Sequence, residues 1–497
     1  MNIRNRIYND ALVSKVMEAN EAALFITDGM NLGCSGFTYC GYPKALPLAL
    51  AERVKRGESI KIGLVTGAST GVELDDALAS VGAISRRYPY QTGKIINREI
   101  NDGNTMYHDI HLSRVAEQVR CGFLGHLDIA VIEATAIMED GSIVPTTSVG
   151  ASPTFVSEAD NVIVEINMVQ PMEMVGIHDI YVPVDPPHRQ PIPITDPSQR
   201  IGRIAIPCDP GKIIAICRSD RLDGTRPLAA VNDVSRSMAA NLIDFVNRKI
   251  RGCFYRDLPP LQSGVGGVAN AVMGGILESE WTGLLLYSEV IQDAILDLID
   301  AGKLTFASAT SLALSPEGLR RFYRNIERYR DKVILRPQEI SNSPEVLNRL
   351  GVVAMNTAFE VDIYGNVNST HMFGSNIING IGGSGDFSRN AYLSIFLTPS
   401  TVRDGAISRI VPHVTHVDHT EHEVHVIVTE EGVADLRGLD PRERAEAIIE
   451  NCTHPSYRDA LRDYYRRAAK QTGGHIPVLL DEAFSWHMNY NRTGRMV

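Results

Sequence analysis

Glu289 is the side chain whose position in the sequence first suggests catalysis. It falls just past the apolar run 283–287, which predicts a buried strand, and a glycine turn at 262–270 lies shortly before that run. Ligands of open α/β sheets bind where strands end. A carboxylate placed there, beside backbone N–H groups exposed by the turn, could act as a nucleophile with an oxyanion hole nearby. A structural turn followed by an ordinary strand-end glutamate is the simpler interpretation.

The same glycine turn also imitates a dinucleotide-binding fingerprint. The pattern Gly264-x-Gly266-x-x-Ala269 is followed by a predicted helix, a strand and an acidic residue about 20 positions on. That fingerprint needs a strand directly before its first glycine, and the preceding stretch 257–262 contains two prolines, which a central strand does not accommodate. We therefore expect no such strand here. A nucleotide-binding oxidoreductase using nicotinamide or flavin, or a non-catalytic nucleotide-binding module, remains the alternative from a different class.

The elements that must position these residues alternate between strands and helices along the chain. Apolar runs followed by small-residue turns and helical patterns predict an α/β fold in both halves. Helices are predicted at 11–28 and 234–249, and Ser315 and Ser343 each precede a proline at a first helical position. The predicted strands are 30–37, 60–65, 127–134, 162–167, 213–217, 304–308 and 333–335.

A polar, turn-rich stretch at 219–231 marks the predicted domain boundary. We predict two α/β domains, residues 1–225 and 226–497, with the second carrying Glu289. Prolines crowd between residues 171 and 210, which predicts an irregular but ordered loop region, and the C-terminal region is predicted to be mainly helical.

Composition limits the classes of partner. The 497 residues carry a formal charge of −11, which argues against a nucleic acid or an anionic membrane as the main partner. No apolar run approaches a membrane span, and residues 1–6 lack the apolar core of a secretion signal. None of the seven cysteines forms a C-x-x-C pair, which is typical of reduced thiols. These features predict a cytoplasmic protein with no membrane partner.

A specific resemblance emerges from several motifs taken in order. The motifs are the turn at 262–266, the stretch 287–293, Ser341-Asn342-Ser343-Pro344, the stretch 362–370 and the second glycine cluster at 379–387, with 66–71, 416–419 and 434–438 in support. Together they resemble the class I coenzyme A transferases, in the acetyl-CoA hydrolase/transferase branch, over nearly the whole chain. The resemblance implies open, mostly parallel sheets, an active site in the cleft between the two domains, and a homodimer.

The resemblance implies that Glu289 is the catalytic nucleophile. Its carboxylate would attack an acyl thioester to give an acyl-glutamyl anhydride, and the released CoA thiolate would convert this to a glutamyl-CoA thioester. A second carboxylate would reverse the steps. Coenzyme A is then a substrate and product, and no tightly bound cofactor is expected. Carboxylate attack on a thioester is poor in water, so binding of the CoA nucleotide must position the sulfur.

The two glycine clusters would supply donors and CoA contacts. The resemblance assigns the oxyanion hole to the backbone N–H groups of Val265 and Gly383, and it gives Asn342 the task of steadying the glutamyl-thioester carbonyl. Arg403 stands where related enzymes often carry lysine, which keeps the charge but changes the geometry of a phosphate contact. The expected CoA contacts are Gly264, Val265, Gly266, Gly267, Val268, Asn379, Gly383 and Arg403.

The carboxylate substrate would meet a different set of residues. The resemblance implies Ser69, Thr92, Glu430 and one arginine, which is Arg226 or Arg221 because the alignment slips between 217 and 227. The N-terminal stretch 6–15 resembles that of the acetate-using enzymes of the family, which implies exchange of CoA between succinyl-CoA and acetate. Exchange between propionyl-CoA and succinate, and hydrolysis of acetyl-CoA, are the alternatives within the family.

Five histidines at every third position, from His413 to His425, invite a metal hypothesis. The intervening valines, threonine and isoleucine favour an extended chain, in which residues three apart alternate faces and do not converge on one ion. We therefore expect no metal site in this segment.

Overall fold

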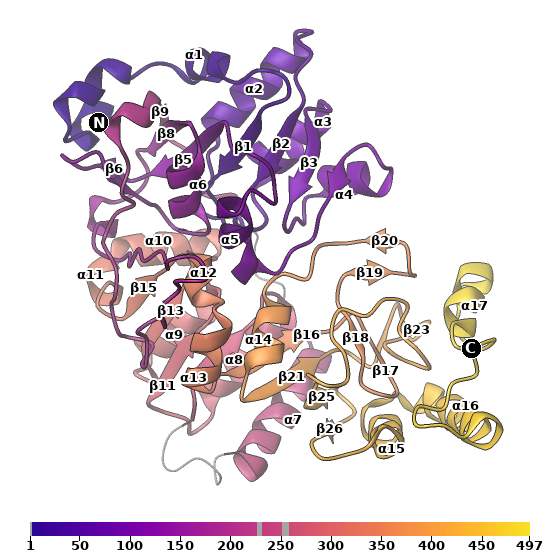
Figure 1. The fold of residues 1–497 in the computed structure, drawn as a ribbon. Coiled ribbons are helices and arrows are strands. Elements are labelled where there is room, and N and C mark those ends of the chain that lie inside the picture. Colours follow the sequence, from indigo (N-terminus) through magenta and orange to yellow (C-terminus); the bar gives the residue numbers. More distant parts are fainter. Residues whose placement is uncertain (1, 226–230, 251–257) are drawn as a thin grey trace. The chain divides into compact units, whose positions relative to one another are not determined.

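The computed structural model describes residues 2–225, 231–250 and 258–497, and they form two compact units that do not follow the order of the chain (Figure 1). Unit 1 contains Met1–Pro227, Leu285–Asp300 and Leu304–Leu350; unit 2 contains Leu228–Leu284, Ala301–Lys303 and Gly351–Val497. Glu289 therefore groups with the N-terminal part of the chain by contacts. The predicted division at 225/226 concerns domains along the sequence and stays a prediction.

The sheet of the N-terminal region has seven parallel strands in the order β4-β3-β2-β1-β5-β8-β9. The chain moves outward from β1 to β4 and then returns to β5, so the direction of winding changes between β1 and β5. Ligands of such sheets bind beyond the carboxyl ends of the strands at this switch point. The strands are β1 Asn31–Cys34, β2 Ile62–Val65, β3 Ile84–Tyr88, β4 Met106–Tyr107, β5 Ile129–Ala134, β8 Asn161–Asn167 and β9 Ile213–Ser219.

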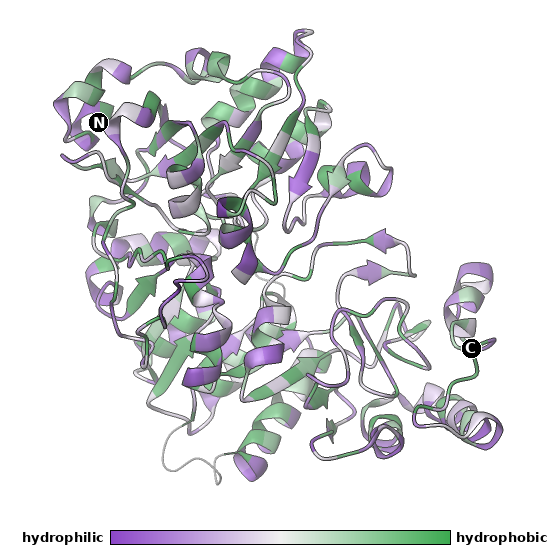
Figure 2. Cartoon of the chain, in the orientation of Figure 1, coloured by the Kyte–Doolittle hydropathy of each residue, from purple (hydrophilic) through white to green (hydrophobic). Residues whose placement is uncertain are grey.

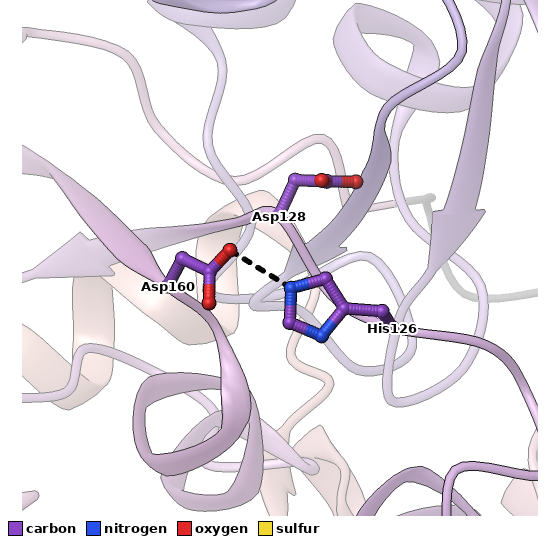
Figure 3. Close-up of side chains that lie close together, drawn as sticks. All are labelled: His126, Asp128 and Asp160. Carbon is purple, nitrogen blue, oxygen red and sulfur yellow. Dashed lines mark hydrogen bonds and ion pairs between the residues drawn. The ribbon is translucent and has the colours of Figure 1, made fainter.

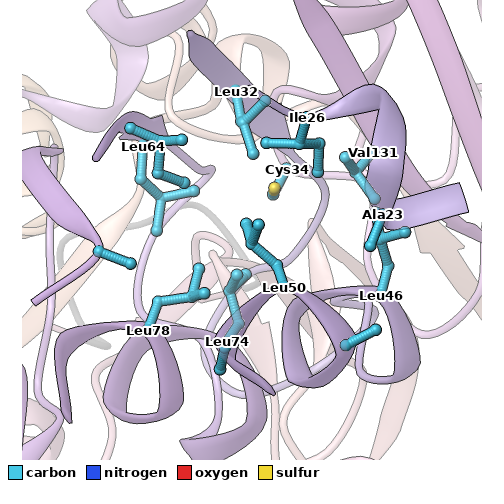
Figure 4. Close-up of a cluster of buried hydrophobic side chains, with 14 of the residues drawn as sticks. Ala23, Ile26, Leu32, Cys34, Leu46, Leu50, Leu64, Leu74, Leu78 and Val131 are labelled. Atoms are coloured by element: carbon cyan, nitrogen blue, oxygen red, sulfur yellow. The ribbon is translucent and has the colours of Figure 1, made fainter. Parts of the chain in front are cut away.

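Apolar side chains on both faces explain why this sheet lies inside the unit. β5 and β8 are hydrophobic along most of their length (Figure 2), as strands covered on both faces must be. One face packs Leu32 and Leu64 against Leu46, Leu50 and Leu78 from the helices (Figure 4). On β1, Gly33 lets the helix α6 approach, because an added Cβ would lie 2.8 Å from the ring of Phe155. The helices are α1 Ala19–Ala22, α2 Ala45–Lys55, α3 Ala77–Ser80, α4 Lys94–Asn101, α5 Val115–Arg120 and α6 Ser152–Glu158.

The prediction of one continuous helix at 11–28 was wrong. The structure breaks it into the 3-10 helix Asp10–Lys15, the single turn α1 and a second 3-10 helix, Ala23–Phe25. The break has a physical cause: Val16 pairs with Ile216 of β9, and the N–H of Met17 donates to the carbonyl of Ile216. A main-chain bond to the edge of the sheet thus replaces the helical bonds at this point.

Unit 1 also contains the segment that carries Glu289. Its strands β13 and β15 are parallel, and the short strands β12 and β14 pair in parallel as well. Ser315 caps α10 by accepting a hydrogen bond from the N–H of Gly318, which confirms the predicted helix start. The elements are β11 Leu284–Tyr287, β12 Val290–Ile291, α9 Asp293–Asp300, β13 Leu304–Ala309, β14 Ser311–Leu312, α10 Pro316–Arg324, α11 Ile326–Tyr329, β15 Val333–Leu335, α12 Gln338–Ser341 and α13 Pro344–Leu350.

Unit 2 is built on the strand order β10-β16-β21-β25-β26, parallel except for β26. The long helices α7 and α8 pack on each other, and a second core gathers under the C-terminal helices, whose presence was predicted. The elements are α7 Asp233–Lys249, β10 Leu261–Ser263, α8 Gly267–Glu278, β16 Val353–Thr357, β17 Glu360–Asp362, β18 Val367–Asn368, β19 His371–Met372, β20 Asn376–Ile377, α14 Ser384–Asn390, β21 Leu393–Leu397, β22 Thr401–Val402, β23 Ile407–Ser408, β24 Ile410–Val411, β25 Val426–Val428, β26 Val433–Asp435, α15 Pro441–Cys452, α16 Pro455–Thr472 and α17 Ser485–Thr493.

The expectation that no strand precedes Gly264 was wrong. β10 occupies Leu261–Ser263, directly before that glycine, and pairs in parallel with β16. Pro259 and Pro260 lie just outside the strand, where their missing N–H groups cost no ladder hydrogen bond, while the carbonyl of Pro260 accepts from the N–H of Val353. The prolines thus set where the strand begins rather than preventing it.

The proline-rich stretch between residues 171 and 210 is irregular, as predicted, and buried charge holds it in place. The carboxylate of Asp179 accepts hydrogen bonds from the N–H groups of Ile201 and Gly202, and it pairs with the fully buried Arg336. The remaining short strands form the antiparallel pair β6 Ala136–Ile137 and β7 Ile143–Val144. In the part of the chain that the structure describes, no helix is both long and apolar enough to cross a bilayer.

A tyrosine hydroxyl lies between two glycines that are far apart in the sequence. The buried Tyr42 donates to the carboxylate of Glu73 at 2.6 Å and accepts from the N–H of Gly224 at 3.1 Å. A Cβ atom added at Gly224 would lie 2.5 Å from this hydroxyl, and one added at Gly71 would overlap it. The hydroxyl therefore fixes how closely three segments of unit 1 approach.

A buried ion cluster joins β5 to the loop that follows β9. Lys44 is fully buried, contacts the carboxylate of Glu133 and lies 3.0 Å from that of Asp223. Burial alone would lower the pKa of Lys44, but the carboxylates of Asp223 and Glu133 raise it overall. Burial raises the pKa of Glu133 to about 8, against the opposing effect of Lys44. Asp223 also receives hydrogen bonds from the N–H of Gly41 and the hydroxyl of Thr147, so it anchors its loop to the strand ends.

Removing the cation of this cluster should destabilise unit 1. Lys44→Met leaves two buried carboxyl groups without their partner, and we expect a loss of about 3–5 kcal/mol in the free energy of unfolding. Urea titration followed by circular dichroism measures it. A Lys44→Met protein as stable as the parent would show that the cluster contributes no net stability.

Glu133→Gln is the matched variant, because its neutral amide resembles the protonated carboxyl group. It should cost about 1 kcal/mol or less near neutral pH. Since the pKa of Glu133 is about 8 in the folded protein and 4.5 for an ordinary glutamate, as in the unfolded chain, the folded protein binds the extra proton between these values. Glu133 therefore makes folding less favourable as the pH rises through this window, and the stability of the Gln variant relative to the parent should improve from about pH 5 to about pH 8.

Candidate active site

Main-chain hydrogen bonds hold the backbone at Glu289 and at the residue before it. Glu289 lies two residues after β11, and the N–H of Ser288 donates to the carbonyl of Ser308 at 3.0 Å. The carbonyl of Glu289 accepts hydrogen bonds from the N–H groups of Thr310 and Ser311, at 2.9 and 3.1 Å. The next residues form β12, which pairs with β14. The predicted location at a strand end is therefore confirmed, and it fixes the direction in which the carboxylate leaves the main chain.

Asn342 holds the carboxylate itself. Its Nδ2 donates to Oε1 of Glu289 at 2.7 Å, and the hydroxyl of Ser341 donates to its Oδ1 at 2.8 Å. The second bond orients the amide so that its nitrogen, a donor, faces Glu289. Asn342 is fully buried between α12 and α13, whereas Glu289 is half-buried. The structure thus brings together two residues that lie 53 positions apart and were both predicted for the site.

Ser69 and Thr92 are linked through Tyr39. The N–H of Tyr39 donates to the carbonyl of Ser69 at 3.1 Å, and its hydroxyl is hydrogen-bonded to Oγ1 of Thr92. Thr38 and Tyr39 have φ angles of +48° and +65°, an arrangement that costs energy for residues with large side chains. Tyr39 thus contacts both predicted carboxylate-binding residues, one through its main chain and one through its hydroxyl.

Two buried side chains in this region carry polar atoms that form no hydrogen bond with the described residues. Within the described residues, Oγ of Ser69 and both amide atoms of Gln91 have no hydrogen-bond partner, although the exposed fractions of Ser69 and Gln91 are 1% and 0%. Leaving such groups unpaired is unfavourable by about 1–3 kcal/mol each, unless water or a ligand satisfies them. Sequence reasoning missed Tyr39 and Gln91, because neither a left-handed backbone nor an unpaired amide leaves a sequence pattern.

The first glycine turn joins β10 to α8 and presents backbone N–H groups. Gly266 adopts a φ of +113° and precedes α8, which has no side-chain cap. The N–H of Gly264 is already used, since it donates to the carbonyl of Met355 at 3.1 Å. The N–H groups at the uncapped start of α8, including those of Gly267 and Val268, are typical of a site for a phosphate or an oxyanion. Val265 itself has 45% of its surface exposed.

The second glycine turn precedes α14. Gly382 has a φ of +59°, and Gly383 takes the N-cap position, where its carbonyl accepts from the N–H of Phe387 at 3.0 Å. Both α8 and α14 pack against β16, so the two glycine turns belong to helices anchored on the same strand. Asn379 lies in the loop between β20 and this turn.

Arg403 and Glu430 have partners within unit 2. Arg403 lies in the turn between β22 and β23 with a φ of +52°, and its Nη1 donates to the hydroxyl of Tyr490 at 2.5 Å. The carboxylate of Glu430 accepts hydrogen bonds from the N–H and the hydroxyl of Ser400, at 2.8 and 2.5 Å. These bonds hold Glu430 beside the start of the β22–β23 hairpin.

Of the two arginines expected to meet the carboxylate substrate, the structure describes one. Arg226 lies outside the described residues. The alternative, Arg221, is exposed, and its carbonyl accepts from Nδ2 of Asn167 at 2.7 Å. Asp223, anchored by Lys44, lies two residues after Arg221, so the buried ion cluster holds the loop that carries Arg221.

The histidine-rich segment forms turns, and the expectation of an extended strand there was wrong except at its end. The strand β25 begins only at Val426, because Asp418 and His419 return to β18: their N–H groups donate to the carbonyl of Val367 at 2.9 and 3.1 Å. The rings of His371 and His416 are tilted by 37° to each other, with their centroids 3.9 Å apart. His419 is fully buried.

Among the described residues, one group of potential metal ligands occurs elsewhere, at His126, Asp128 and Asp160 (Figure 3). Nε2 of His126 lies 2.8 Å from Oδ2 of Asp160, and both side chains are more than half exposed. Asp128 already accepts a hydrogen bond from the N–H of Asn31. The group lies where β5 and β8 begin, at the amino ends of the strands and away from the edge that carries ligands in such sheets.

Two family profiles match this chain, one in its N-terminal part and one in its C-terminal part. The profile of the acetyl-CoA hydrolase/transferase N-terminal domain matches residues 1–218, and that of the corresponding C-terminal domain matches residues 318–465. The chain belongs to the acetyl-CoA hydrolase/transferase family. It is therefore an enzyme of the CoA transferase and hydrolase type, and the resemblance inferred from its motifs is confirmed.

Three curated relatives are similar to this chain over more than nine-tenths of their own length. A succinyl-CoA:acetate CoA-transferase of Clostridium kluyveri is 52% identical over 99% of this chain and 92% of its own length. A propanoyl-CoA:succinate CoA transferase of Escherichia coli is 44% identical, over 97% of this chain and 98% of its own. An acetyl-CoA hydrolase of Candida albicans is 44% identical, over 99% of this chain and 98% of its own.

Solved structures confirm the predicted fold class. RipA from Yersinia pestis aligns with a TM-score of 0.73 at 25% identity, covering 95% of this chain and all of the RipA chain. A 4-hydroxybutyrate CoA-transferase from Porphyromonas gingivalis aligns with a TM-score of 0.64 at 20% identity, over 92% of this chain and 99% of its own. The fold is that of the class I CoA-transferases. A strand before Gly264 removes the local objection to a dinucleotide fingerprint, but the family accounts for that glycine turn without an oxidoreductase.

The bond between Asn342 and Glu289 generates a direct test. Asn342→Ala should lower kcat by about tenfold to a hundredfold, because the carboxylate loses the donor that holds its direction. Asn342→Asp should be worse, since it places a second carboxylate at hydrogen-bonding distance from Glu289. Ser341→Ala is the matched control: it removes only the group that orients the amide, and its effect should be smaller than that of Asn342→Ala. Steady-state kinetics on acyl-CoA turnover measures all three, and an unchanged kcat in Asn342→Ala would remove Asn342 from the site.

Proposed function

We propose that this enzyme transfers CoA from succinyl-CoA to acetate, giving succinate and acetyl-CoA, with Glu289 as the covalent nucleophile. The observation that carries the proposal is how Glu289 is held just after β11. Asn342 donates to its carboxylate, and two N–H groups donate to its main-chain carbonyl. The 52% identity to a succinyl-CoA:acetate CoA-transferase supports the choice of this substrate pair.

The chemistry begins when an oxygen of Glu289 attacks the thioester carbonyl of succinyl-CoA. The carbon–sulfur bond breaks, the CoA thiolate leaves, and a succinyl-glutamyl anhydride forms. The thiolate then attacks the glutamyl carbonyl and expels succinate, which leaves CoA bound to Glu289 as a thioester. Acetate attacks that thioester, and the same two steps in reverse order release acetyl-CoA and the free carboxylate. Every addition places negative charge on a carbonyl oxygen, so fixed hydrogen-bond donors lower the barriers.

Backbone donors are suited to this charge because they are in place before it develops. In the proposal the N–H groups of Val265 and Gly383 stabilise the oxyanions, and Nδ2 of Asn342 remains on the glutamyl oxygen when the carboxylate becomes a thioester carbonyl. Since the N–H of Gly264 is bonded to Met355, this glycine contributes the close approach of the chain rather than a donor. Gly266, Gly267, Val268, Asn379 and Arg403 complete the proposed CoA contacts.

The proposed carboxylate pocket contains Ser69 and Thr92, with Arg226 as the cation and Glu430 beside it. The unpaired hydroxyl of Ser69 and the unpaired amide of Gln91 support the proposal, because a bound carboxylate would satisfy buried donors of this kind. Glu430 beside a carboxylate would be repulsive if both were charged and unpaired. Its bonds to Ser400 reduce that cost by supplying two donors.

Hydrolysis is a second candidate because water competes for the same intermediates. The relatives include a chain named acetyl-CoA hydrolase at 44% identity, and a propanoyl-CoA:succinate transferase is equally similar. In hydrolysis, water would take the place of the second carboxylate at the glutamyl-CoA thioester.

We also propose a homodimer in the cytoplasm, on the basis of the family resemblance, and sedimentation of the purified enzyme tests the dimer.

The covalent step predicts a defined adduct. Incubation of the enzyme with succinyl-CoA, without acetate, should give a CoA adduct on the peptide that contains Glu289, detected by mass spectrometry. Glu289→Ala should abolish both the adduct and turnover while keeping the parent circular dichroism spectrum. Glu289→Asp should also be severely impaired, because the shorter side chain moves the nucleophile beyond the tolerance of an attack geometry. Turnover of Glu289→Ala at the parent rate would refute covalent catalysis at this residue.

The substrate pair predicts an order among acceptors. With succinyl-CoA as donor, acetate should give a higher kcat/KM than propionate or butyrate, and consumption without an acceptor should be much slower. One methylene changes binding by only about 1–3 kcal/mol, so a difference of about tenfold or more between acetate and propionate is expected. A kcat/KM for propionate well above that for acetate would favour the propionyl-CoA activity, and equal consumption without an acceptor would favour the hydrolase.

A further inference from the structure

His419 is a fully buried histidine whose ring contacts the helix that follows the second glycine turn. Its Nε2 lies 3.1 Å from the hydroxyl of Ser384 and its Nδ1 lies 3.2 Å from the hydroxyl of Ser388, and these serines are the first and fifth residues of α14. The ring also packs against Phe396, with centroids 4.8 Å apart. His419 therefore spans the first turn of α14.

The hydrogen bonds determine which ring nitrogen donates. Ser384 uses its own hydrogen to donate to the carbonyl of Ile381 at 2.7 Å, so its oxygen accepts from Nε2–H of His419. In the neutral ring, Nδ1 then accepts from the hydroxyl of Ser388. The carboxylate of Glu423 lies 3.5 Å from Nδ1 and would pair with a protonated ring. The hydroxyl of Ser369 also lies 3.4 Å from Nε2 and donates to the carboxylate of Asp418, so its oxygen can accept from Nε2–H as well.

This arrangement fixes the turn that contains Gly382 and Gly383. The hydroxyl of Ser384 joins the ring of His419 to the carbonyl of Ile381, and these contacts enclose the two glycines from both ends. Gly382 adopts a φ of +59°, and glycine has more backbone freedom than any other residue. A turn of two glycines does not hold one N–H direction unless something outside the turn restrains it.

His419 is itself restrained from the other side. Its N–H donates to the carbonyl of Val367, and its carbonyl accepts from the N–H of Val367 at 2.8 Å. The neighbouring Asp418 accepts hydrogen bonds from the N–H of Ser369, at 2.6 Å, and the hydroxyl of Thr370. His419 thus connects β18 to the glycine turn. This contact gives one histidine of the segment from His413 to His425 a structural role that needs no metal ion.

We propose that His419 is a positioning residue for catalysis, which acts through Ser384 to fix the direction of the Gly383 N–H. The proposal rests on the proposed function, in which that N–H stabilises the oxyanion. An oxyanion hole is effective because its donors are oriented before the charge appears. A buried polar group that served only for packing would be better replaced by an apolar side chain, whereas this ring bonds to two serines of the helix that bears the donor.

Two matched pairs of variants test the proposal. Ser384→Ala should lower kcat by about tenfold to a hundredfold with less than a twofold change in KM for acetate, since it disconnects the turn. Ser388→Ala removes the other bond of the same ring, one helical turn further from Gly383, and should keep kcat within about twofold of the parent. His419→Gln retains an amide donor near the position of Nε2, and His419→Asn retains a polar group near Nδ1. His419→Gln should therefore keep much more activity than His419→Asn.

A structural role alone would give a different result. It would lower the melting temperature of both serine variants alike and leave kcat per folded enzyme unchanged, and that outcome, or an equal loss of kcat in Ser384→Ala and Ser388→Ala, would overturn the proposal. The rate of CoA adduct formation on the Glu289 peptide separates this test from that of the proposed function. If the parent forms no adduct, the covalent mechanism fails. If the parent forms it and Ser384→Ala forms it at the same rate, only the role of His419 fails.

Discussion

The proposed chemistry depends on one constraint, the two hydrogen bonds that fix the main-chain carbonyl of Glu289. A glutamate side chain has several rotatable bonds, so its carboxylate reaches a defined place only if the backbone and the carboxylate are both held. The segment after β13 holds the backbone, and Asn342 holds the carboxylate. All of these groups belong to unit 1, which explains why that unit includes residues far along the sequence.

In the proposed mechanism, the second unit meets the opposite requirement with glycine. A donor that approaches a thioester closely must be a main-chain N–H without a bulky neighbour, which favours the turns at 264–267 and 382–383. Such turns have little intrinsic rigidity, so the surrounding side chains must supply it. In the two proposals Asn342 and His419 are comparable in kind: each is a buried polar side chain, hydrogen-bonded to a neighbouring serine hydroxyl, that restrains a more flexible group.

Regular elements could be predicted because their signals are local. Ser315 before a proline marked the start of α10, and the apolar run 333–335 coincides with β15. Long-range contacts decided the failures: the bond from Met17 to β9 interrupted a predicted helix, and β10 forms after two prolines because β16 offers it a partner. At the site, the types and positions of Glu289 and Asn342 came from motifs, but their contact required the fold. Nothing in the sequence indicated the left-handed backbone of Tyr39.

The Tyr42 hydroxyl has a consequence for how this chain can change in evolution. Its oxygen occupies the space that a methyl group would need at Gly71 and at Gly224, so neither glycine can become alanine while the tyrosine remains. Losing the hydroxyl first would open that space and leave the carboxylate of Glu73 and one N–H without their bonds. The two glycines are thus expected to gain a side chain only after the tyrosine has changed. A homologous chain with alanine at either glycine position should therefore carry a smaller residue in place of Tyr42.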